Sequence, residues 1–152
     1  MTPSNAEQFA TLFGIGRVPH APGTVASIVA LPVAWIVIAL WGHFVLLAMS
    51  VAVAVLGAIA GEAYAKSSGT HDPSECVIDE LAGQWLACAL APLTVLGFAM
   101  AFLLFRLFDI VKFWPMSAAE RLEGGLGIVA DDMVAGLLAG VIVALFATSG
   151  LI

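Results

Sequence analysis

Charged residues in this chain are confined to short segments between long apolar runs that contain no Asp, Glu, Lys or Arg. These runs cover residues 25–40, 44–60, 81–105 and 133–152. A helix needs roughly 17 to 25 apolar residues to cross a hydrocarbon core of about 30 Å. Since lipid offers no partners for backbone polar groups, we expect such runs to be helical.

The overall composition indicates the same fold class. The 152 residues are 62% hydrophobic and only 11% charged, whereas soluble domains carry about 25% charged residues. So little charge cannot cover a soluble surface, and we expect one all-α integral membrane domain over residues 1–152, a helical bundle in contact with the lipid bilayer. The net charge of −6 argues against a nucleic-acid partner, and no obligate protein partner is predicted.

Charge also predicts how the helices are connected. Gly42 separates the first two runs into a helical hairpin, and the run 81–105 is expected to turn at residues 92–94. With that turn, every charged segment reaches the same side of the membrane, including all the basic residues. These are Arg17, Lys66, Arg106, Lys112 and Arg121. By the positive-inside rule this side is cytoplasmic, which predicts about five membrane helices with the N-terminus inside and the C-terminus outside.

The first residues of the chain differ from the membrane helices. In residues 3–14, apolar side chains at i, i+3, i+4 and i+7 predict a short amphipathic helix that lies on the membrane surface. A Gly/Pro-rich stretch follows, with the sequence GIGRVPHAPGT. Its last residue, Thr24, is predicted to be the N-cap of the first membrane helix.

Two acidic pairs stand at the boundaries of apolar runs. Asp79 and Glu80 precede the run 81–105, and Asp131 and Asp132 precede the last run. Carboxylates are costly at a bilayer boundary and tend to be kept for function. The simpler interpretation is that these residues N-cap their helices, where negative charge complements the helix dipole, but one acidic cap would suffice for that. Two adjacent pairs exceed that role and predict a Mg²⁺ site, because Mg²⁺ prefers oxygen ligands.

Small residues predict that these pairs meet inside the bundle. Gly136 and Gly140 continue a stripe at i, i+4 from Asp132, and Gly83 lies one turn beyond Asp79. Small residues let helices approach closely in lipid. The stripe is therefore expected to pack against another helix and to bring Asp132 inward.

A third charged segment predicts a phosphate site. Arg106, Asp109 and Lys112 are spaced at i, i+3 and i+6. They could form a ladder of salt bridges. Alternatively, the two cations could bind a phosphate, with Asp109 joining the metal ligands or orienting Arg106. We favour phosphate binding for Arg106 and leave both interpretations open for Lys112.

Two loop signals are weaker when taken alone. The GIGRVPHAPGT loop ends at a helix N-terminus, where backbone N–H groups can bind phosphate, but in isolation a plain turn is the better explanation. His71 could protonate a leaving group or orient a ligand, although a single loop histidine is more often structural.

Together these residues resemble one known family, phosphatidylglycerophosphatase A, a group of bacterial inner-membrane lipid phosphatases. The matching blocks, in order, are GIGRVPHAPGTVAS, HDPSECVIDELAG, FRLFDIVKFWP and GGLGIVADDMVAG. The resemblance implies an all-helical fold and Mg²⁺-dependent removal of the terminal phosphate from phosphatidylglycerophosphate. The positions that the family conserves correspond here to Gly14, Gly16, Pro22, Gly23, Thr24, Ser27, Asp72, Asp79, Glu80, Gly83, Arg106, Asp109, Lys112, Asp131, Asp132 and Gly136.

The residues and the resemblance together assign roles. The expected metal ligands are Asp79, Glu80, Asp131 and Asp132. The expected phosphate ligands are Arg106, Lys112, Arg17, Gly23, Thr24 and Ser27. The expected catalytic residues are Asp131, Asp79, Asp109, Asp72 and His71, with either of the last two as the proton donor. The nucleophile is left open between water and an aspartate, and the active site is expected on the cytoplasmic face of a multi-pass inner-membrane protein.

Three other functions are less consistent with the pattern. A cation transporter or channel, the main alternative, could use the same carboxylates but would need acids deep within its membrane helices. An intramembrane aspartyl protease needs two facing aspartates that share a proton, whereas the acids here are numerous and lie beside cations. A non-catalytic subunit gives no reason for so many carboxylates at one interface.

Overall fold

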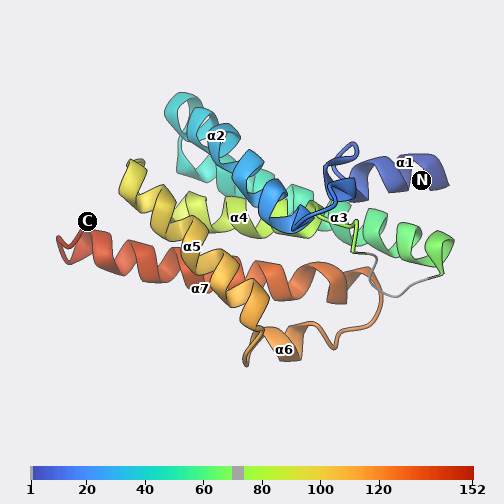
Figure 1. The fold of residues 1–152 in the computed structure, drawn as a ribbon. Helices are drawn as coiled ribbons and strands as arrows, with labels where there is room; N and C mark the ends of the chain where they lie inside the picture. Colours follow the sequence, from blue (N-terminus) through green and yellow to red (C-terminus); the bar gives the residue numbers. More distant parts are fainter. Residues whose placement is uncertain (1, 70–73) are drawn as a thin grey trace.

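The computed structural model describes residues 2–69 and 74–152, and all regular secondary structure within them is helical. The elements are α1 (Pro3–Ala10), the 3₁₀ helix η1 (Ile15–Arg17), α2 (Pro22–Trp41), α3 (His43–Ser68), α4 (Ile78–Leu90), α5 (Val95–Val111), α6 (Met116–Ala119) and α7 (Gly125–Thr148). They form an elongated bundle with the two termini at opposite ends (Figure 1). The all-helical fold expected from the sequence is confirmed.

Helices α2 and α3 form the predicted hairpin, with Gly42 alone between them. Gly42 has a φ of 84°, a conformation that glycine adopts without a steric penalty. Helix α3 nevertheless extends beyond the predicted run 44–60. It continues for two more turns until Gly69 ends it in the left-handed conformation, because a C-terminal glycine terminates a helix independently of where its apolar run stops.

The start of α2 differs from the prediction. The helix begins at Pro22, and Ala21 is the N-cap residue, without a side-chain capping bond. Proline is favoured in the first turn because its missing N–H would have no partner there. Thr24 therefore lies inside the first turn, and its predicted role as N-cap is wrong.

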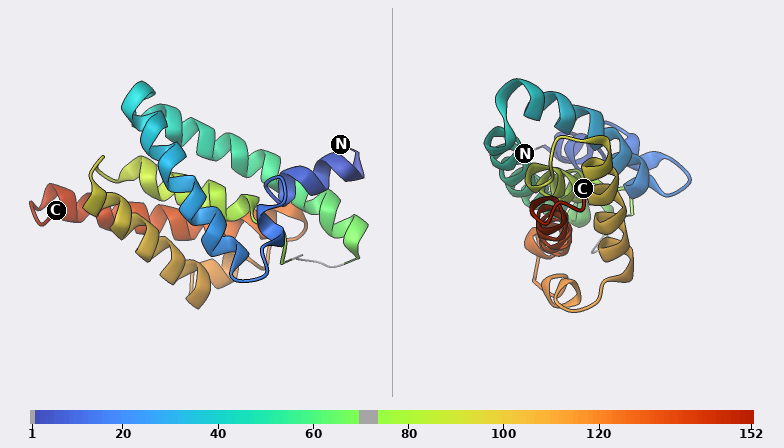
Figure 2. Two further views of the ribbon diagram at one scale, coloured as in Figure 1. Left: turned by 45° about the horizontal axis from the view of Figure 1, so that its top comes forward. Right: turned by 90° about the vertical axis from the view of Figure 1, so that its left-hand side faces the viewer.

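Helix α4 is the central element of the bundle. Its 13 residues are enclosed by α2, α3, α5 and α7, as the end-on view in Figure 2 shows. The side chains of residues 82–89 are all buried. Trp85 Nε1 donates to the carbonyl oxygen of Ala30 on α2 at 3.1 Å, and Ser50 Oγ on α3 donates to that of Ala82 at 2.8 Å. The predicted turn at residues 92–94 follows and leads into α5.

Within the described residues, three helices, α2, α3 and α7, are long and apolar enough to cross a membrane. Helices α4 and α5, with 13 and 17 residues, are shorter. The outer faces of the long helices expose large apolar side chains such as Ile36, Val55 and Leu145. An apolar surface of this extent suits contact with lipid rather than water. The fold is thus that of a helical membrane protein, and the predicted count of about five membrane helices is not confirmed.

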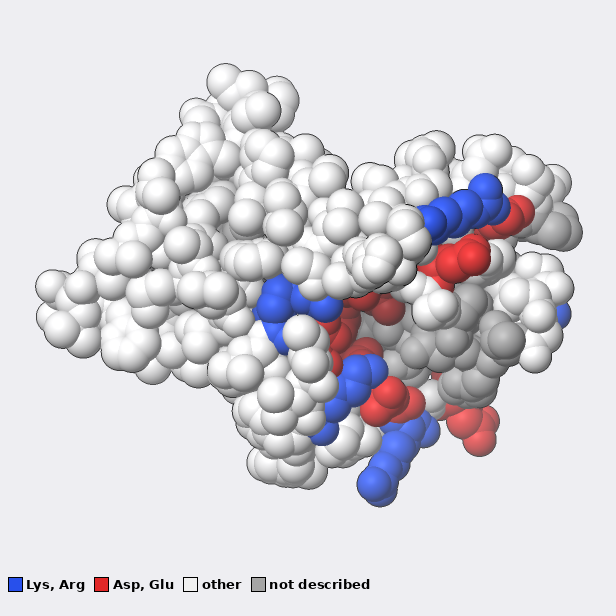
Figure 3. Space-filling model, viewed as in Figure 1, with Lys and Arg blue, Asp and Glu red and all other residues white. Residues whose placement is uncertain are grey.

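Charged side chains gather over one half of the molecule. In Figure 3 blue and red atoms occupy the right-hand part and the centre of the view, whereas the part that carries the C-terminus and the α2–α3 turn is free of them. This separation agrees with the charge-free runs in the sequence. The charged side chains that could form a functional site therefore lie near the start of α4 and the end of α5.

Candidate active site

The start of α4 and the second turn of α7 bring three carboxylates together. Asp79 and Glu80 lie in the first turn of α4, and Asp132 lies in α7. Oxygen atoms of these three side chains lie within 4.8 Å of one another. One small cation placed among them could contact all three, which is a ligand set that Mg²⁺ accepts.

Two glycines allow this approach of α4 and α7. A Cβ atom on Gly83 would lie 2.5 Å from the carbonyl oxygen of Asp132, and one on Gly136 would lie 2.2 Å from the carbonyl oxygen of Gly83. Both distances are far below van der Waals contact, so only hydrogen fits at these positions. The small residues thus bring Asp132 against α4, as the stripe in the sequence predicted.

The position of the second acidic pair in its helix corrects a sequence prediction. Helix α7 begins at Gly125 with Gly124 as its N-cap, so Asp131 and Asp132 lie about two turns inside the helix rather than at its start. Neither α4 nor α7 has a side-chain N-cap bond. The interpretation of Asp131 and Asp132 as simple helix caps is therefore excluded, because a cap precedes the first turn.

Helix α5 adds an arginine and a fourth carboxylate. Arg106 Nη1 lies 2.5 Å from Asp109 Oδ2, and the two side chains are only 14% and 12% exposed. The carboxyl group of Asp109 also shares a small cavity with that of Asp132. Asp109 therefore connects the arginine to the carboxylate cluster, which makes both roles considered for it from the sequence geometrically feasible.

Lys112 follows α5 and contacts the remaining carboxylate of the second pair. Its Nζ lies 2.8 Å from Asp131 Oδ2 and 2.9 Å from Glu120 Oε1. Partial burial acts to lower the pKa of Lys112, but the hydrogen bonds to Asp131 and Glu120 outweigh it and hold the pKa above its ordinary value. Glu120 was not found from the sequence, because it lies eight residues from Lys112, beyond the i, i+3 and i, i+4 spacings at which side chains on one helix meet.

These groups surround a small cavity of about 120 Å³. Its lining is mostly polar and comes from α4, α5, α7 and the loops before α4 and α7. The lining residues are Ser74, Cys76, Asp79, Glu80, Asp109, Lys112, Glu120, Gly127, Ile128, Asp131 and Asp132. The cavity thus joins the predicted metal ligands to Lys112, one of the three predicted phosphate-binding cations.

Several buried polar atoms at or beside this cavity have no hydrogen-bond partner among the described residues. They include Glu80 Oε2 and Asp132 Oδ2 in its lining and Arg106 Nε beside it. Buried polar groups are nearly always paired, and an unpaired carboxylate costs several kcal/mol (roughly 3–5) in a buried site. A divalent cation would satisfy the two carboxylate oxygens, so the residues present fit Mg²⁺ or another hard cation.

The Gly/Pro-rich loop meets the same cluster through one glycine. A Cβ atom on Gly23 would lie 2.0 Å from Glu80 Oε1 and 3.3 Å from Arg106 Nη1. Gly23 therefore leaves room for the side chain of Glu80 and lies at the edge of the site. Buried Ser27 uses its hydroxyl to donate to the carbonyl oxygen of Gly23 at 2.9 Å, and Thr24 is partly buried in the same turn.

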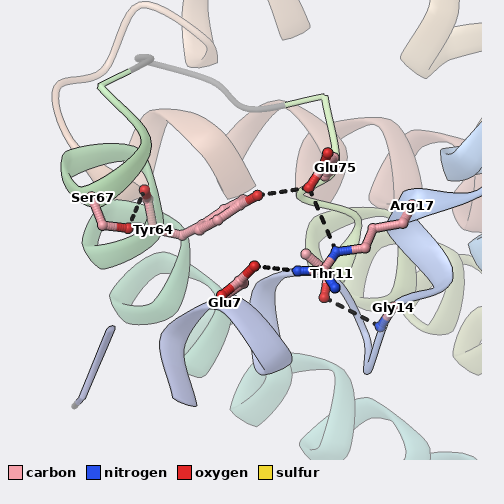
Figure 4. Close-up of polar contacts among 7 residues, drawn as sticks. All are labelled: Glu7, Thr11, Gly14, Arg17, Tyr64, Ser67 and Glu75. Atoms are coloured by element: carbon pink, nitrogen blue, oxygen red, sulfur yellow. Dashed lines mark hydrogen bonds and ion pairs between the residues drawn. The ribbon is translucent and has the colours of Figure 1, made fainter. Parts of the chain in front are cut away.

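Arg17 lies in a separate polar network between the loop, α1 and the end of α3 (Figure 4). It forms ion pairs with Glu7 and, at 3.9 Å, with Glu75. Tyr64 OH donates to Glu75 Oε2 at 2.7 Å. Arg17 does not line the carboxylate cavity, and its predicted contact with phosphate stays a prediction. The predicted proton donors His71 and Asp72 lie outside the described residues.

The carboxylate cavity and its cations have the composition of a site for a phosphate ester, and comparison with known proteins identifies the family. The model of the family "Phosphatidylglycerophosphatase A" matches residues 8–147. The chain belongs to the phosphatidylglycerophosphatase A family. This membership makes the protein a phosphoric monoester hydrolase of the lipid phosphatase type, and the cation transporter considered from the sequence is not favoured.

Curated relatives cover most of the chain. Phosphatidylglycerophosphatase A of Escherichia coli is 33% identical over 128 residues, covering 83% of this chain and 74% of the relative. That of Haemophilus influenzae is 34% identical over 133 residues, covering 86% and 82%. A Bacteroides thetaiotaomicron protein named "Putative phosphatidylinositol-3-phosphatase" is 36% identical over 141 residues, covering 88% of each chain. No solved structure matches.

Proposed function

We propose that this enzyme hydrolyses phosphatidylglycerophosphate to phosphatidylglycerol and inorganic phosphate with Mg²⁺ as cofactor. The observation that carries the proposal is the pair of unpartnered carboxylate oxygens, Glu80 Oε2 and Asp132 Oδ2, buried beside Arg106. Such a site favours a cation and a phosphate together over either alone. The names of the Escherichia coli and Haemophilus influenzae relatives support the choice of substrate.

In this proposal Asp79, Glu80 and Asp132 hold the metal, with Asp131 as a fourth ligand. Bound there, Mg²⁺ supplies charge neutralisation for the phosphate and acidifies a water molecule. Asp131 is well placed for a second task, because its Oδ2 already faces the cavity and Lys112. We assign to Asp131 the acceptance of the proton from the attacking water.

The cations bind the phosphate oxygens. Arg106 is held by Asp109 with its Nε unpartnered, so it can donate to a phosphate without breaking the ion pair. Lys112 bridges two carboxylates in the structure and can turn one of its three N–H donors toward the substrate. Donation from both stabilises the charge on the equatorial oxygens in the transition state. Gly23, Thr24 and Ser27 border the phosphate from the start of α2, and His71 or Asp72 supplies the leaving-group proton.

The protein is proposed to lie in a bacterial inner membrane with this site on the cytoplasmic side. All five basic residues belong to the charged segments, which the positive-inside rule places in the cytoplasm. In this arrangement α2, α3 and α7 cross the bilayer. Helices α4 and α5 complete the five predicted helices, with α4 protected from lipid by its neighbours because it is too short to span alone.

Phosphatidylinositol 3-phosphate is a second candidate substrate, because the Bacteroides thetaiotaomicron relative carries that activity in its name. Both lipids present a phosphomonoester at the membrane surface. The carboxylate cavity accommodates the phosphate of either, so the choice between them depends on the rest of the head group.

Phosphate release from detergent-purified protein tests the proposal. Each lipid is offered with Mg²⁺, with EDTA, and with EDTA followed by excess Mg²⁺. We expect release from phosphatidylglycerophosphate that EDTA abolishes and Mg²⁺ restores, and that falls by about 100-fold or more in Asp131→Asn. Release that persists in EDTA would refute the metal requirement. A folded, Mg²⁺-supplied protein that cleaves only phosphatidylinositol 3-phosphate would refute the substrate.

A further inference from the structure

An apolar groove of about 330 Å³ runs between α2 and α5. Pockets of roughly 300–1,000 Å³ commonly hold small ligands. Six residues line this one, namely Leu31, Pro32, Trp35, Val95, Phe98 and Ala99. The rings of Trp35 and Phe98 meet edge to face with their centroids 5.1 Å apart, joining the two helices. Because Val95 is 80% exposed, the groove is open to the surroundings of the bundle.

The groove lies between two helices that both reach the candidate active site at their charged ends. On α2, Leu31 and Trp35 follow Thr24 on the same face, at spacings of seven and eleven residues. On α5, Arg106 shares a face with Ala99 at a spacing of seven. The two helices run in opposite directions, so the start of α2 meets the end of α5 (Figure 1).

Between the groove and the charged end of the bundle, the two helices approach each other closely at Gly23 and Arg106. Arg106 Nη1 lies 3.3 Å from the position of a Cβ on Gly23, and it pairs with Asp109 at the rim of the carboxylate cavity. In Figure 3, blue atoms in the middle of this face border red atoms. Ala99, the groove residue on α5 nearest to this point, lies seven residues from Arg106, a helix rise of about 10 Å.

The distance from Arg106 to the far end of the groove matches one leaflet. Eleven residues separate Arg106 from Val95, a helix rise of about 16 Å, and half of a hydrocarbon core of about 30 Å is about 15 Å. A second apolar depression, lined by His43, Phe44 and Leu47 among others, lies at the uncharged end. A lipid seated there could not place its head group at the carboxylates.

We propose that the α2–α5 groove binds an acyl chain of the lipid substrate while the phosphate lies at Arg106 and the carboxylate cavity. This inference rests on the proposed function for the head group and adds a binding site for the tail. The groove faces the bilayer from the side, so the substrate reaches the carboxylates by lateral movement in the leaflet. The apolar wall then contributes to affinity through close packing against the acyl chain, since lipid is already as apolar as the groove.

The test is to fill the groove and compare substrates with and without acyl chains. Ala99→Phe places a ring in the groove, and Ala52→Phe makes the same change on the exposed face of α3, away from the groove. Each variant and the wild type is assayed with dioleoyl phosphatidylglycerophosphate in mixed micelles and with its deacylated, water-soluble head group. We expect Ala99→Phe to raise KM for the acylated lipid about tenfold, the equivalent of about two methylene contacts, with kcat/KM for the deacylated compound and all values for Ala52→Phe unchanged.

A photocrosslinking measurement gives a second readout that does not depend on the variant folding. Phosphatidylglycerophosphate with a diazirine in one acyl chain is expected to label peptides of α2 and α5 in the wild type, and excess unlabelled substrate should suppress this labelling. Three outcomes would overturn the proposed acyl-chain site. They are an equal KM in Ala99→Phe and wild type, equal losses of activity in both variants, and labelling that spreads over α3 and α7. A wild type that is inactive on phosphatidylglycerophosphate would instead refute the proposed function, and this inference with it.

Discussion

Two polar clusters in this protein have similar chemistry and very different environments. In the outer network, Arg17 is 55% exposed and paired with Glu7 and Glu75. In the carboxylate cluster, Arg106 is 14% exposed and its Nε has no partner, although Asp109 lies beside it. Both clusters place an arginine among acids, but only one is buried and incompletely paired.

The difference distinguishes a structural role from a functional one. Exposed ion pairs contribute little to stability, about 0–1 kcal/mol, and water can replace either partner. Buried groups that lack partners destabilise the fold, so they persist where another requirement keeps them. In the buried cluster, that requirement is the binding of a cation and a phosphate. The outer network connects α1 and the loop to the end of α3.

The largest effect is expected from removing the charge of Asp132, the buried carboxylate of α7 that lies against α4. Asp132→Asn should lower phosphate release about 100- to 1,000-fold, because a metal ligand and its charge are lost. Mg²⁺ should raise the melting temperature of the wild type and not that of the variant, by linkage. The matched variant in the outer network, Glu75→Gln, should retain both the wild-type rate of phosphate release and the rise in melting temperature with Mg²⁺. Equal losses in the two variants would remove the distinction between the clusters.

A smaller but still large effect is expected from Gly23→Ala. Its Cβ would meet Glu80 Oε1 at 2.0 Å and push this carboxylate away, and a displacement of about 1 Å can cost about 100-fold in rate. In the control Gly61→Ala, the nearest atom is Ile128 Cδ1 at 3.3 Å, the flexible end of a side chain. Steady-state kinetics should separate the two alanine variants, and normal activity in Gly23→Ala would show that Glu80 can move without consequence.

An effect of intermediate size is expected when the two arginines are compared directly. Arg106→Lys keeps the charge but loses the planar donors, and should lower kcat/KM about tenfold, the equivalent of one charge-assisted hydrogen bond. Arg17→Lys should change it by less than about threefold, because Arg17 is exposed and already paired with carboxylates. A loss of comparable size in Arg17→Lys would instead support the phosphate contact predicted for Arg17 from the sequence.

The smallest expected effect is on stability alone. Glu7→Gln removes the ion pair with Arg17 and should lower the free energy of unfolding by less than about 1 kcal/mol, since the pair is exposed. Chemical denaturation in detergent measures this, with phosphate release as the functional control. A loss above about 2 kcal/mol would mean that the outer network holds α1 in place far more strongly than a surface pair should.

Much of the site was predictable because charge is so rare in this chain. Asp79, Glu80 and Asp132 could be recognised as candidate ligands from their place beside charge-free runs, and Gly83 and Gly136 as contact points from their spacing. Glu120 was missed, because its relation to Lys112 exists only after the loop containing α6 folds back. The place of Asp131 and Asp132 within α7 was also missed, because the helix starts in a glycine-rich segment that resembles a turn.

The sequence by itself determined the helical fold, the hairpin at Gly42, the turn after α4 and the set of charged groups near the membrane boundary. These follow from local properties, namely the length of apolar runs, glycine and proline positions, and the cost of charge in lipid. Only the tertiary structure decided which of those charged groups meet. Arg17 pairs with Glu7 and Glu75, while Asp132 joins Asp79 and Glu80 in the buried cluster. The reason is that partner choice depends on how closely helices approach, and glycine contacts between α4 and α7 set that approach.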